Sequence, residues 1–162
     1  MNRLTDRIVM NALSKVGVRE SAFEDGPEAR EWLKRAKRSS PAPWSTAFAW
    51  CMLDNTCAQL GLHNPIDPCA SVHLLMALAR EKGAWTESPA PGYLFGIDNG
   101  CSGSYRLGHC GIVIEEDLSG LCRTVEGPED LVGCRRGDRV FIKTRCASEF
   151  TLGCLDPGKL FT

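Results

Sequence analysis

The fold depends first on residues 44–60, which read WSTAFAWCMLDNTCAQL. Apolar side chains occupy every turn of this stretch, and Gly61 follows it directly. Residues such as Ala, Leu and Met favour a helix, and glycine commonly ends one. A helix that is apolar on all sides leaves no face for water. We therefore predict a buried helix over residues 44–60.

Three further helices are predicted, over residues 3–16, 27–38 and 72–82. Apolar residues recur at helical spacing in the first of them, and Gly17 ends it. Pro27 opens the second, and the basic residues at its end suit the helix dipole. We expect that basic group to face solvent. Gly83 stops the last of the three helices.

Short β-prone runs separated by turns fill the second half of the chain. Strands are predicted over residues 93–97, 110–115, 122–125, 140–143 and 150–154. Residues 98–108 are rich in Gly and Ser, so we expect a loop there. Helices followed by strands are typical of an α+β fold, with N-terminal helices packed on a C-terminal antiparallel β-sheet. A chain of 162 residues has room for one core, so we expect one domain over residues 1–162.

The composition excludes several functional classes. The chain is 43% hydrophobic and 24% charged, and its formal net charge is −1. A near-neutral chain lacks the basic surface typical of nucleic-acid binding, and no apolar run approaches the roughly 18–20 residues of a membrane span. Asp6, Arg7 and Asn11 interrupt the apolar residues near the N-terminus, so no Sec signal is predicted. We expect synthesis in the cytoplasm and export, if any, by another route.

The chain contains nine cysteines, and no two of them form a Cys-x-x-Cys pair. This spacing argues against a zinc ribbon and against a thioredoxin-type redox motif. We expect most of the thiols to act as small buried hydrophobes. The cysteines from Cys101 to Cys154 fall in the strand-rich half, where neighbouring strands could bring thiols together. A few of them could therefore form disulfides if the protein works in an oxidising compartment.

His109 is the best candidate for a catalytic base among the three histidines. It lies in Gly108-His109-Cys110-Gly111, at the start of a predicted strand. The glycines allow the backbone or a substrate to approach closely, which predicts that His109 faces a cleft. The alternative is an ordinary histidine that packs or caps. His63 and His73 lie in a loop and at a helix start, without such a pattern.

Ser45 stands where a loop enters the buried helix. Its ordinary role would be that of an N-cap, because serine is favoured there. A nucleophile at this position would also gain from the positive end of the helix dipole. That field stabilises a thiolate strongly and a serine hydroxyl far less.

Trp44-Ser45-Thr46-Ala47-Phe48 resembles the Trp-Cys-Ser-Ala-Phe opening of the catalytic helix in CHAP-type amidohydrolases and peptidases. With the NlpC-type cell-wall hydrolases, these enzymes belong to the papain-like superfamily. Other stretches resemble family motifs in the same order over about residues 16–158: Gly17–Glu20, Pro89–Phe95, Gly108–Val113, Thr124–Gly127, Leu152-Gly153 and Pro157-Gly158.

The resemblance implies a papain-like fold, with the nucleophile at a helix N-terminus and its partners on the facing sheet. Residue 45 would be the nucleophile, His109 the general base and Glu126 the residue that orients the imidazole. We also expect Trp44 and Gly108 to contact the substrate. The implied reaction is hydrolysis of an amide in peptidoglycan, at the sugar–peptide junction or within the peptide, without a metal or other cofactor.

Two departures from the family pattern matter. The family has Cys where this chain has Ser45, which leaves three interpretations open: an engineered substitution that traps an inactive form, which we favour, a natural pseudoenzyme, or a working Ser-His-Glu hydrolase. Neither Cys51, farther along the helix, nor Cys110, on the opposite face from His109, is placed to replace it. Pro128 stands where the family often has Asn, so Glu126 would act alone. Glu129 and Asp130 are the alternative candidates for the orienting residue.

A peptidoglycan hydrolase without wall-binding repeats suits a phage lysis enzyme or a secreted interbacterial effector. It would act on the cell wall in the periplasm of a target or host cell, and an effector would have a cognate immunity protein. Two alternatives stay open: a papain-like transferase or deamidase acting on a protein or lipid, and a non-catalytic peptidoglycan-binding pseudoenzyme.

Overall fold

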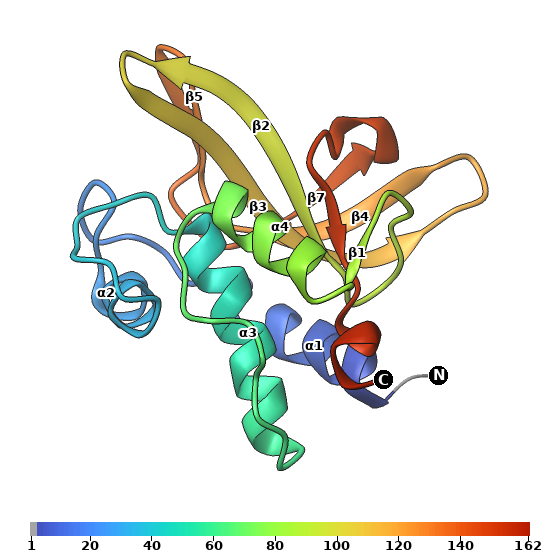
Figure 1. Cartoon of the computed structure of the whole chain (residues 1–162). Helices are drawn as coiled ribbons and strands as arrows, with labels where there is room; N and C mark the ends of the chain where they lie inside the picture. Colours follow the sequence, from blue (N-terminus) through green and yellow to red (C-terminus); the bar gives the residue numbers. More distant parts are fainter. Residues whose placement is uncertain (1–2) are drawn as a thin grey trace.

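Helix α3 (Ser45–Gln59) lies at the centre of the computed structural model, which describes residues 3–162 (Figure 1). Eleven of its fifteen residues are buried. The predicted buried helix is therefore confirmed, and its first residue is Ser45. Helix α1 (Arg3–Leu13) covers one side of α3, where Asn11 Nδ2 donates a hydrogen bond of 2.8 Å to Thr56 Oγ1.

Helix α2 (Pro27–Arg35) covers another side of α3, and its Trp32 ring lies 5.0 Å from the ring of Phe48. The helix ends three residues earlier than predicted. Lys37 adopts a left-handed conformation with φ of 64°, and the Arg38 N–H donates back to the Leu33 carbonyl at 2.8 Å. These two features close the helix as a left-handed C-terminal residue commonly does.

The remaining helix, α4 (Val72–Glu81), packs on the sheet, and Ser71 caps it by accepting a hydrogen bond from the Leu74 N–H. Within residues 3–162, no helix combines the length and the hydropathy needed to cross a bilayer.

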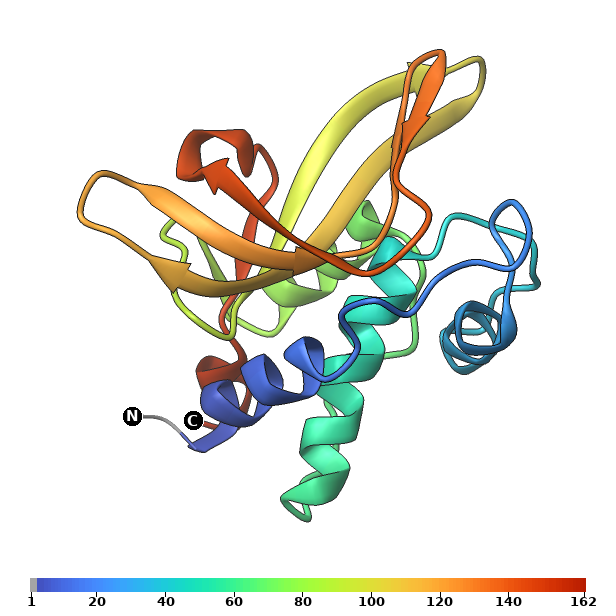
Figure 2. The same ribbon diagram turned by 180° about the vertical axis from the view of Figure 1, so that it is seen from behind.

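Six strands form one curled antiparallel sheet in the order β1–β8–β2–β3–β4–β7 (Figures 1 and 2). Their bounds are Trp85–Thr86 for β1, Leu94–Ser102 for β2, Tyr105–Glu116 for β3, Leu121–Glu126 for β4, Phe141–Cys146 for β7 and Gly153–Leu155 for β8. The sheet follows the helices in the chain, which confirms the predicted α+β class with a C-terminal antiparallel sheet.

The predicted loop over residues 98–108 is wrong, because β2 and β3 continue through it as a long hairpin. Ser102 pairs with Tyr105 across the turn, and Gly103 in that turn has a φ of 61°. A shift of register between Asp98 and Cys101 marks a bulge. The glycines thus serve a bulge and a tight turn, and not an irregular loop. As a result, His109 lies inside a strand and not at its start.

A second, two-stranded sheet was not predicted. It consists of β5 (Glu129–Leu131) and β6 (Cys134–Arg136), and it begins just beyond the end of β4. It lies beside the β2–β3 hairpin, where the Asn99 side chain donates a hydrogen bond of 3.1 Å to the Asp130 carbonyl. Two 3₁₀ helices, η1 (Ala147–Glu149) and η2 (Pro157–Phe161), complete the chain, and η1 precedes the shortened strand β8.

The two faces of the sheet carry two different apolar clusters. Leu94, Cys110 and Ile112 pack in the large cluster shared with the helices. Phe95 and Val113, their neighbours along the strands, pack in a smaller cluster with Phe150 on the other face. Successive side chains of a strand point to opposite faces, so this division follows directly from the alternation of each strand.

All nine cysteines are free thiols, six of them buried and three exposed. Burial raises the pKa of the Cys51 thiol to about 12 and that of Cys110 well above its usual range. The expectation that most of the cysteines are small buried hydrophobes is therefore confirmed.

We predict that the protein, denatured without reductant, gives nine thiols in a quantitative thiol titration. In the native protein only Cys101, Cys134 and Cys146 should react rapidly, because the other six thiols are buried and protonated. Fewer than nine thiols in denaturant would demonstrate a disulfide and contradict the structure.

Candidate functional site

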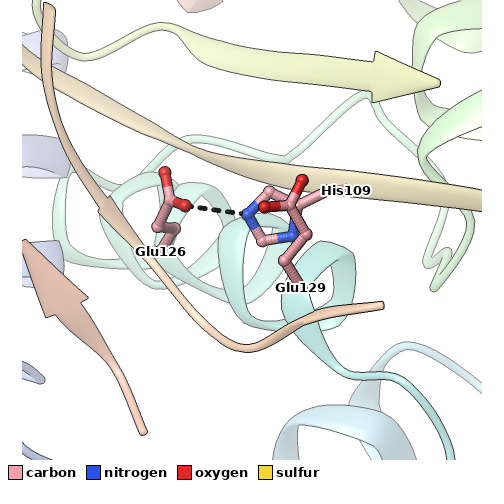
Figure 3. A group of neighbouring side chains, drawn as sticks. All are labelled: His109, Glu126 and Glu129. Carbon is pink, nitrogen blue, oxygen red and sulfur yellow. Dashed lines mark hydrogen bonds and ion pairs between the residues drawn. The ribbon is translucent and has the colours of Figure 1, made fainter. Parts of the chain in front are cut away.

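His109 and Glu126 meet on neighbouring strands of the main sheet. The register of β3 and β4 places Gly111 opposite Glu126, and His109 lies two residues before Gly111 on the same face. His109 Nε2 lies 3.0 Å from Glu126 Oε1, and both side chains are fully buried (Figure 3). The structure thus brings together the base and the orienting residue expected from the sequence.

The glycines on either side of His109 make this packing possible. A Cβ atom on Gly111 would lie 2.7 Å from the Phe95 ring and 2.8 Å from the Glu126 Cβ. A Cβ atom on Gly108 would lie 2.3 Å from a methyl group of Val72 at the start of α4. Both positions therefore require glycine for close approach by protein side chains.

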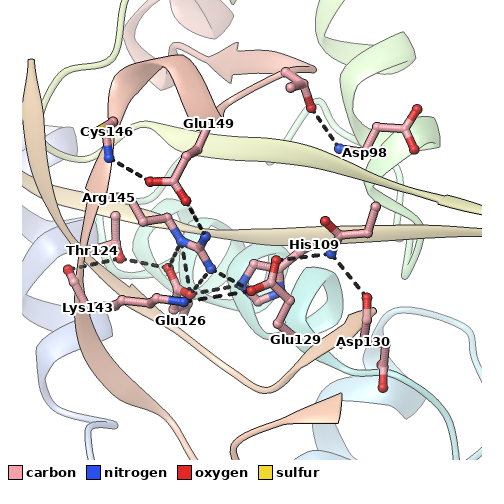
Figure 4. Close-up of polar contacts among 12 residues, drawn as sticks. Asp98, His109, Thr124, Glu126, Glu129, Asp130, Lys143, Arg145, Cys146 and Glu149 are labelled. Carbon is pink, nitrogen blue, oxygen red and sulfur yellow. Dashed lines mark hydrogen bonds and ion pairs between the residues drawn. The ribbon is translucent and has the colours of Figure 1, made fainter. Parts of the chain in front are cut away.

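Arg145 of β7 belongs to the same buried cluster, and sequence reasoning missed it. It is buried, and its guanidinium contacts three carboxylates: Nε donates to Glu126 Oε2 at 2.9 Å, one terminal nitrogen to Glu129 at 3.0 Å and the other to Glu149 at 3.1 Å (Figure 4). The predicted strand stopped at residue 143, which left Arg145 outside it. The sequence did carry one signal for such a residue. Glu126 and Glu129 lie just after the end of a predicted strand, and buried carboxylates need a cation nearby.

The charge state of Glu126 follows from these contacts. Burial is the largest single influence and raises its pKa, but hydrogen bonds from His109 and Arg145 together outweigh it and lower the pKa to about 2. Thr124 Oγ1 adds a third hydrogen bond of 2.7 Å to Oε2. Glu126 is therefore ionised at neutral pH and can only accept hydrogen bonds.

The ionised Glu126 determines the tautomer of His109. Because Glu126 only accepts, the proton in the shared hydrogen bond belongs to His109 Nε2. Nδ1 is then the basic nitrogen of a neutral ring, and it is buried without a hydrogen-bond partner.

His109, Glu126 and Glu129 also have the spacing of a metal-binding group, because one nitrogen or oxygen of each lies within 4.8 Å of the others (Figure 3). Both carboxylates, however, already accept hydrogen bonds from the Arg145 guanidinium. That side chain supplies the positive charge that a metal ion would bring. The group is therefore best described as an ion-pair network.

Ser45 lies in a cleft of about 640 Å³ between the start of α3, the start of α4 and the β2–β3 hairpin. It is the first residue of α3, and the N-cap is Trp44, which provides no side-chain cap. The expected N-cap role of Ser45 is therefore wrong. The start of α3 keeps its unpaired N–H groups and the positive end of its dipole at the cleft. Gly108 also lines this cleft.

Ser45 and His109 occupy neighbouring parts of the molecule but form no hydrogen bond. The Trp44 ring packs against Gly127, where a Cβ atom would lie only 2.8 Å from it. Ser45 follows Trp44 and Glu126 precedes Gly127, so these two residues lie on segments that are in contact. His109 itself is not among the residues that line the cleft, contrary to expectation. Its ring faces Phe95, 6.1 Å away between centroids, on the sheet face opposite to that of Cys110.

Trp44 does not contact the cleft, which corrects its expected role at the substrate. Its side chain is buried, its ring lies 5.4 Å from that of Trp32, and Nε1 donates a hydrogen bond of 2.8 Å to Glu20. Arg135 of β6 donates to the same carboxylate at 2.8 Å. Trp44 thus joins the start of α3 to the β5–β6 sheet and acts in packing.

The other candidate residues lie as follows. Glu129, held in reserve as an orienting residue, accepts from Asn99 at 3.0 Å and from Arg145, whereas Asp130 lines the cleft and pairs with Arg135 at 3.1 Å. Cys51 and Cys110 are buried in the helix-side core, away from the cleft lining. His63 is exposed in its loop, and His73 lines the cleft 3.7 Å from Asp98.

No protein-family model, curated protein or solved structure matches the chain. The assignment of a function therefore depends on the residues and their geometry.

We predict that Glu126 contributes about 3 kcal/mol of pH-dependent stability, since its pKa falls from an ordinary 4.5 to about 2 on folding. A lowered pKa stabilises the fold above pH 4.5, and this contribution is lost as the pH falls toward 2. Urea unfolding of the parent and of Glu126→Gln should differ most near pH 6 and converge in acid. Glu115→Gln, at an exposed position, is the matched control. A difference that is the same at every pH would contradict the ion-pair assignment.

Proposed function

We propose that this protein has a papain-like architecture built to hydrolyse an amide bond of peptidoglycan, with Ser45 at the position of a nucleophilic cysteine. The observation that carries the proposal is the buried His109–Glu126 pair beside the start of α3, with Nδ1 of the imidazole unpartnered. A catalytic base needs one ring nitrogen held by an orienting group and the other left for the nucleophile. The Trp44–Phe48 motif at the start of a buried helix gives further support.

The proposed chemistry proceeds in two steps. His109 Nδ1 removes the proton of the nucleophile at position 45, which attacks the amide carbonyl carbon. The protonated imidazole then gives that proton to the leaving amine, and an acyl-enzyme remains. In the second step His109 deprotonates a water molecule that attacks the acyl group, which releases a carboxylic acid and restores the nucleophile. The backbone N–H of residue 45 is the proposed donor to the oxyanion.

The residue at position 45 decides whether this chemistry runs. The dipole of α3 and a protonated His109 stabilise a thiolate well, whereas a serine hydroxyl gains little from them. We therefore propose that the Ser45 form binds its substrate and turns it over slowly or not at all. In its biological setting the active form would be a phage lysis enzyme or a secreted interbacterial effector with an immunity protein, acting in the periplasm.

A second candidate function, that of a non-catalytic peptidoglycan-binding pseudoenzyme, is favoured by one observation. His109 is fully buried and makes no hydrogen bond to Ser45, although its Nδ1 has no hydrogen-bond partner. A transferase or deamidase acting on a protein or lipid would use the same residues, and only its products would differ.

We predict that Ser45→Cys greatly raises amide hydrolysis of purified peptidoglycan sacculi, measured by mass spectrometry of the soluble products. Thr46→Cys is the matched control, because it places a thiol one residue farther along α3 in the same cleft. Intact sacculi with both variants, together with retention of the parent on sacculi, would support the pseudoenzyme. Turnover of a protein or lipid amide by Ser45→Cys, with sacculi left intact, would support the transferase or deamidase.

We also predict that His109→Ala in the Ser45→Cys background lowers the rate by about a hundredfold or more, the usual scale for loss of a general base. Glu126→Gln should cost less, because an orienting group is partly replaceable. His63→Ala, in an exposed loop, is the control and should keep full activity. A complete loss with His73→Ala and none with His109→Ala would identify His73 as the base instead.

A further inference from the structure

We propose that Arg145 is a positioning residue, which holds the Glu126 carboxylate ionised and directed at His109 so that residue 45 can be activated. This inference rests on the proposed function. It adds to that function a residue from β7, far from the motifs that led to residues 45, 109 and 126.

The geometry leaves Glu126 a single orientation. Oε1 contacts His109 Nε2, and Oε2 accepts from Thr124 Oγ1 and from Arg145 Nε. A second guanidinium nitrogen of Arg145 also donates to Oε1. A guanidinium that binds both oxygens fixes the plane of a carboxylate, which a single donor cannot do. Rotation of Glu126 away from His109 would break all of these bonds together.

Arg145 is itself held from two other sides. Glu129 of β5 accepts from it at 3.0 Å and Glu149 of η1 at 3.1 Å (Figure 4). Its guanidinium also lies 5.8 Å from the centre of the Phe95 ring. Only 4% of the residue is exposed. A buried guanidinium has few other positions to occupy, so the clamp on Glu126 is rigid.

The charges that face Glu126 come from four elements. His109 lies on β3, Arg145 and Lys143 on β7, and Glu129 on β5, and Glu149 of η1 acts through Arg145. Among these groups Arg145 is the only buried permanent cation. Without it, Glu126 and Glu129 would face each other as two buried carboxylates, and one of them would take up a proton in mild acid.

A protonated Glu126 cannot support a protonated imidazole. The expected consequence of losing Arg145 is therefore a change in pH dependence, with activation of residue 45 failing at a higher pH than in the parent. If Arg145 had only a structural role, its loss would lower stability and leave the pH dependence of activation unchanged.

The first measurement uses the Ser45 protein and needs no substrate. The Glu126 carboxyl is titrated by ¹³C NMR, with its signal assigned by comparison with Glu126→Gln. In the parent it should stay ionised down to about pH 2. Arg145→Met should raise this midpoint by about 1–3 pH units, the usual influence of an adjacent arginine. Arg145→Lys, which keeps the charge, should restore most of the parent behaviour.

The second measurement follows iodoacetamide alkylation of the Ser45→Cys thiol against pH, resolved at residue 45 by peptide mass spectrometry because nine other thiols are present. We expect Arg145→Met to move the acid limb of this profile upward and to lower the rate just below the parent limb by about tenfold or more. Arg123→Met, at an exposed position on β4, is the matched control and should leave the profile unchanged.

Loss of Arg145 alone leaves buried carboxylates unpaired and can prevent folding. A second variant therefore keeps the test interpretable. Arg145→Met combined with Glu129→Gln removes one positive and one negative group together. It should still move the Glu126 midpoint upward, but by less than Arg145→Met alone, because the repulsion between the two carboxylates is removed. Unchanged midpoints in folded variants would overturn the proposal. A shift of the Glu126 titration without any change at residue 45 would overturn it as well, because Arg145 would then stabilise the cluster only. Failure of Ser45→Cys to cleave peptidoglycan would reject the proposed function while leaving both measurements decisive for Arg145.

Discussion

Helix α3 is apolar around its first nine residues, Ser45–Leu53, so other elements must cover that part on every side. Helices α1 and α2, strand β3 and the segment after the helix provide that cover, and Trp50 anchors the segment by donating a hydrogen bond of 3.0 Å to the Ile66 carbonyl. Burial of an apolar helix is favourable through the hydrophobic effect, and the free energy grows with the area removed from water. This requirement brings the start of α3 against the sheet and makes the cleft at Ser45.

A second constraint acts on the other face of the sheet, where charges are buried among aromatic rings. Glu126, Glu129 and Arg145 lie out of water beside Phe95, and each charged group is satisfied by the others. A buried charge without a partner costs several kcal/mol, so these side chains are compatible with the fold only as a set. The same set gives His109 its tautomer. In this region structural stability and the proposed chemistry depend on the same bonds.

Much of the fold could be predicted from local signals. The helices followed from apolar runs and from Gly and Pro near their ends. Each of the five predicted strands overlaps an observed strand, although 150–154 shares only residues 153 and 154 with β8. The errors fell where tertiary contacts decide. The Gly-rich stretch after Ile97 forms a hairpin because β2 and β3 pair across it. Glycines at a bulge and a tight turn give the same local composition as an irregular loop, so composition did not distinguish the two. The β5–β6 sheet was missed because three-residue strands carry too little periodicity.

By itself the sequence determined the order of helices and strands, the burial of α3 and the choice of His109 as candidate base, since these depend on residue types and on spacing along one segment. Glu126 was named as its partner only through the family resemblance. Only the tertiary structure revealed Arg145, the burial of His109 away from the cleft, and the packing role of Trp44. Each of these depends on side chains from different elements meeting in space. The pairing of buried charges is a property of the assembled group, and no stretch of sequence carries it alone.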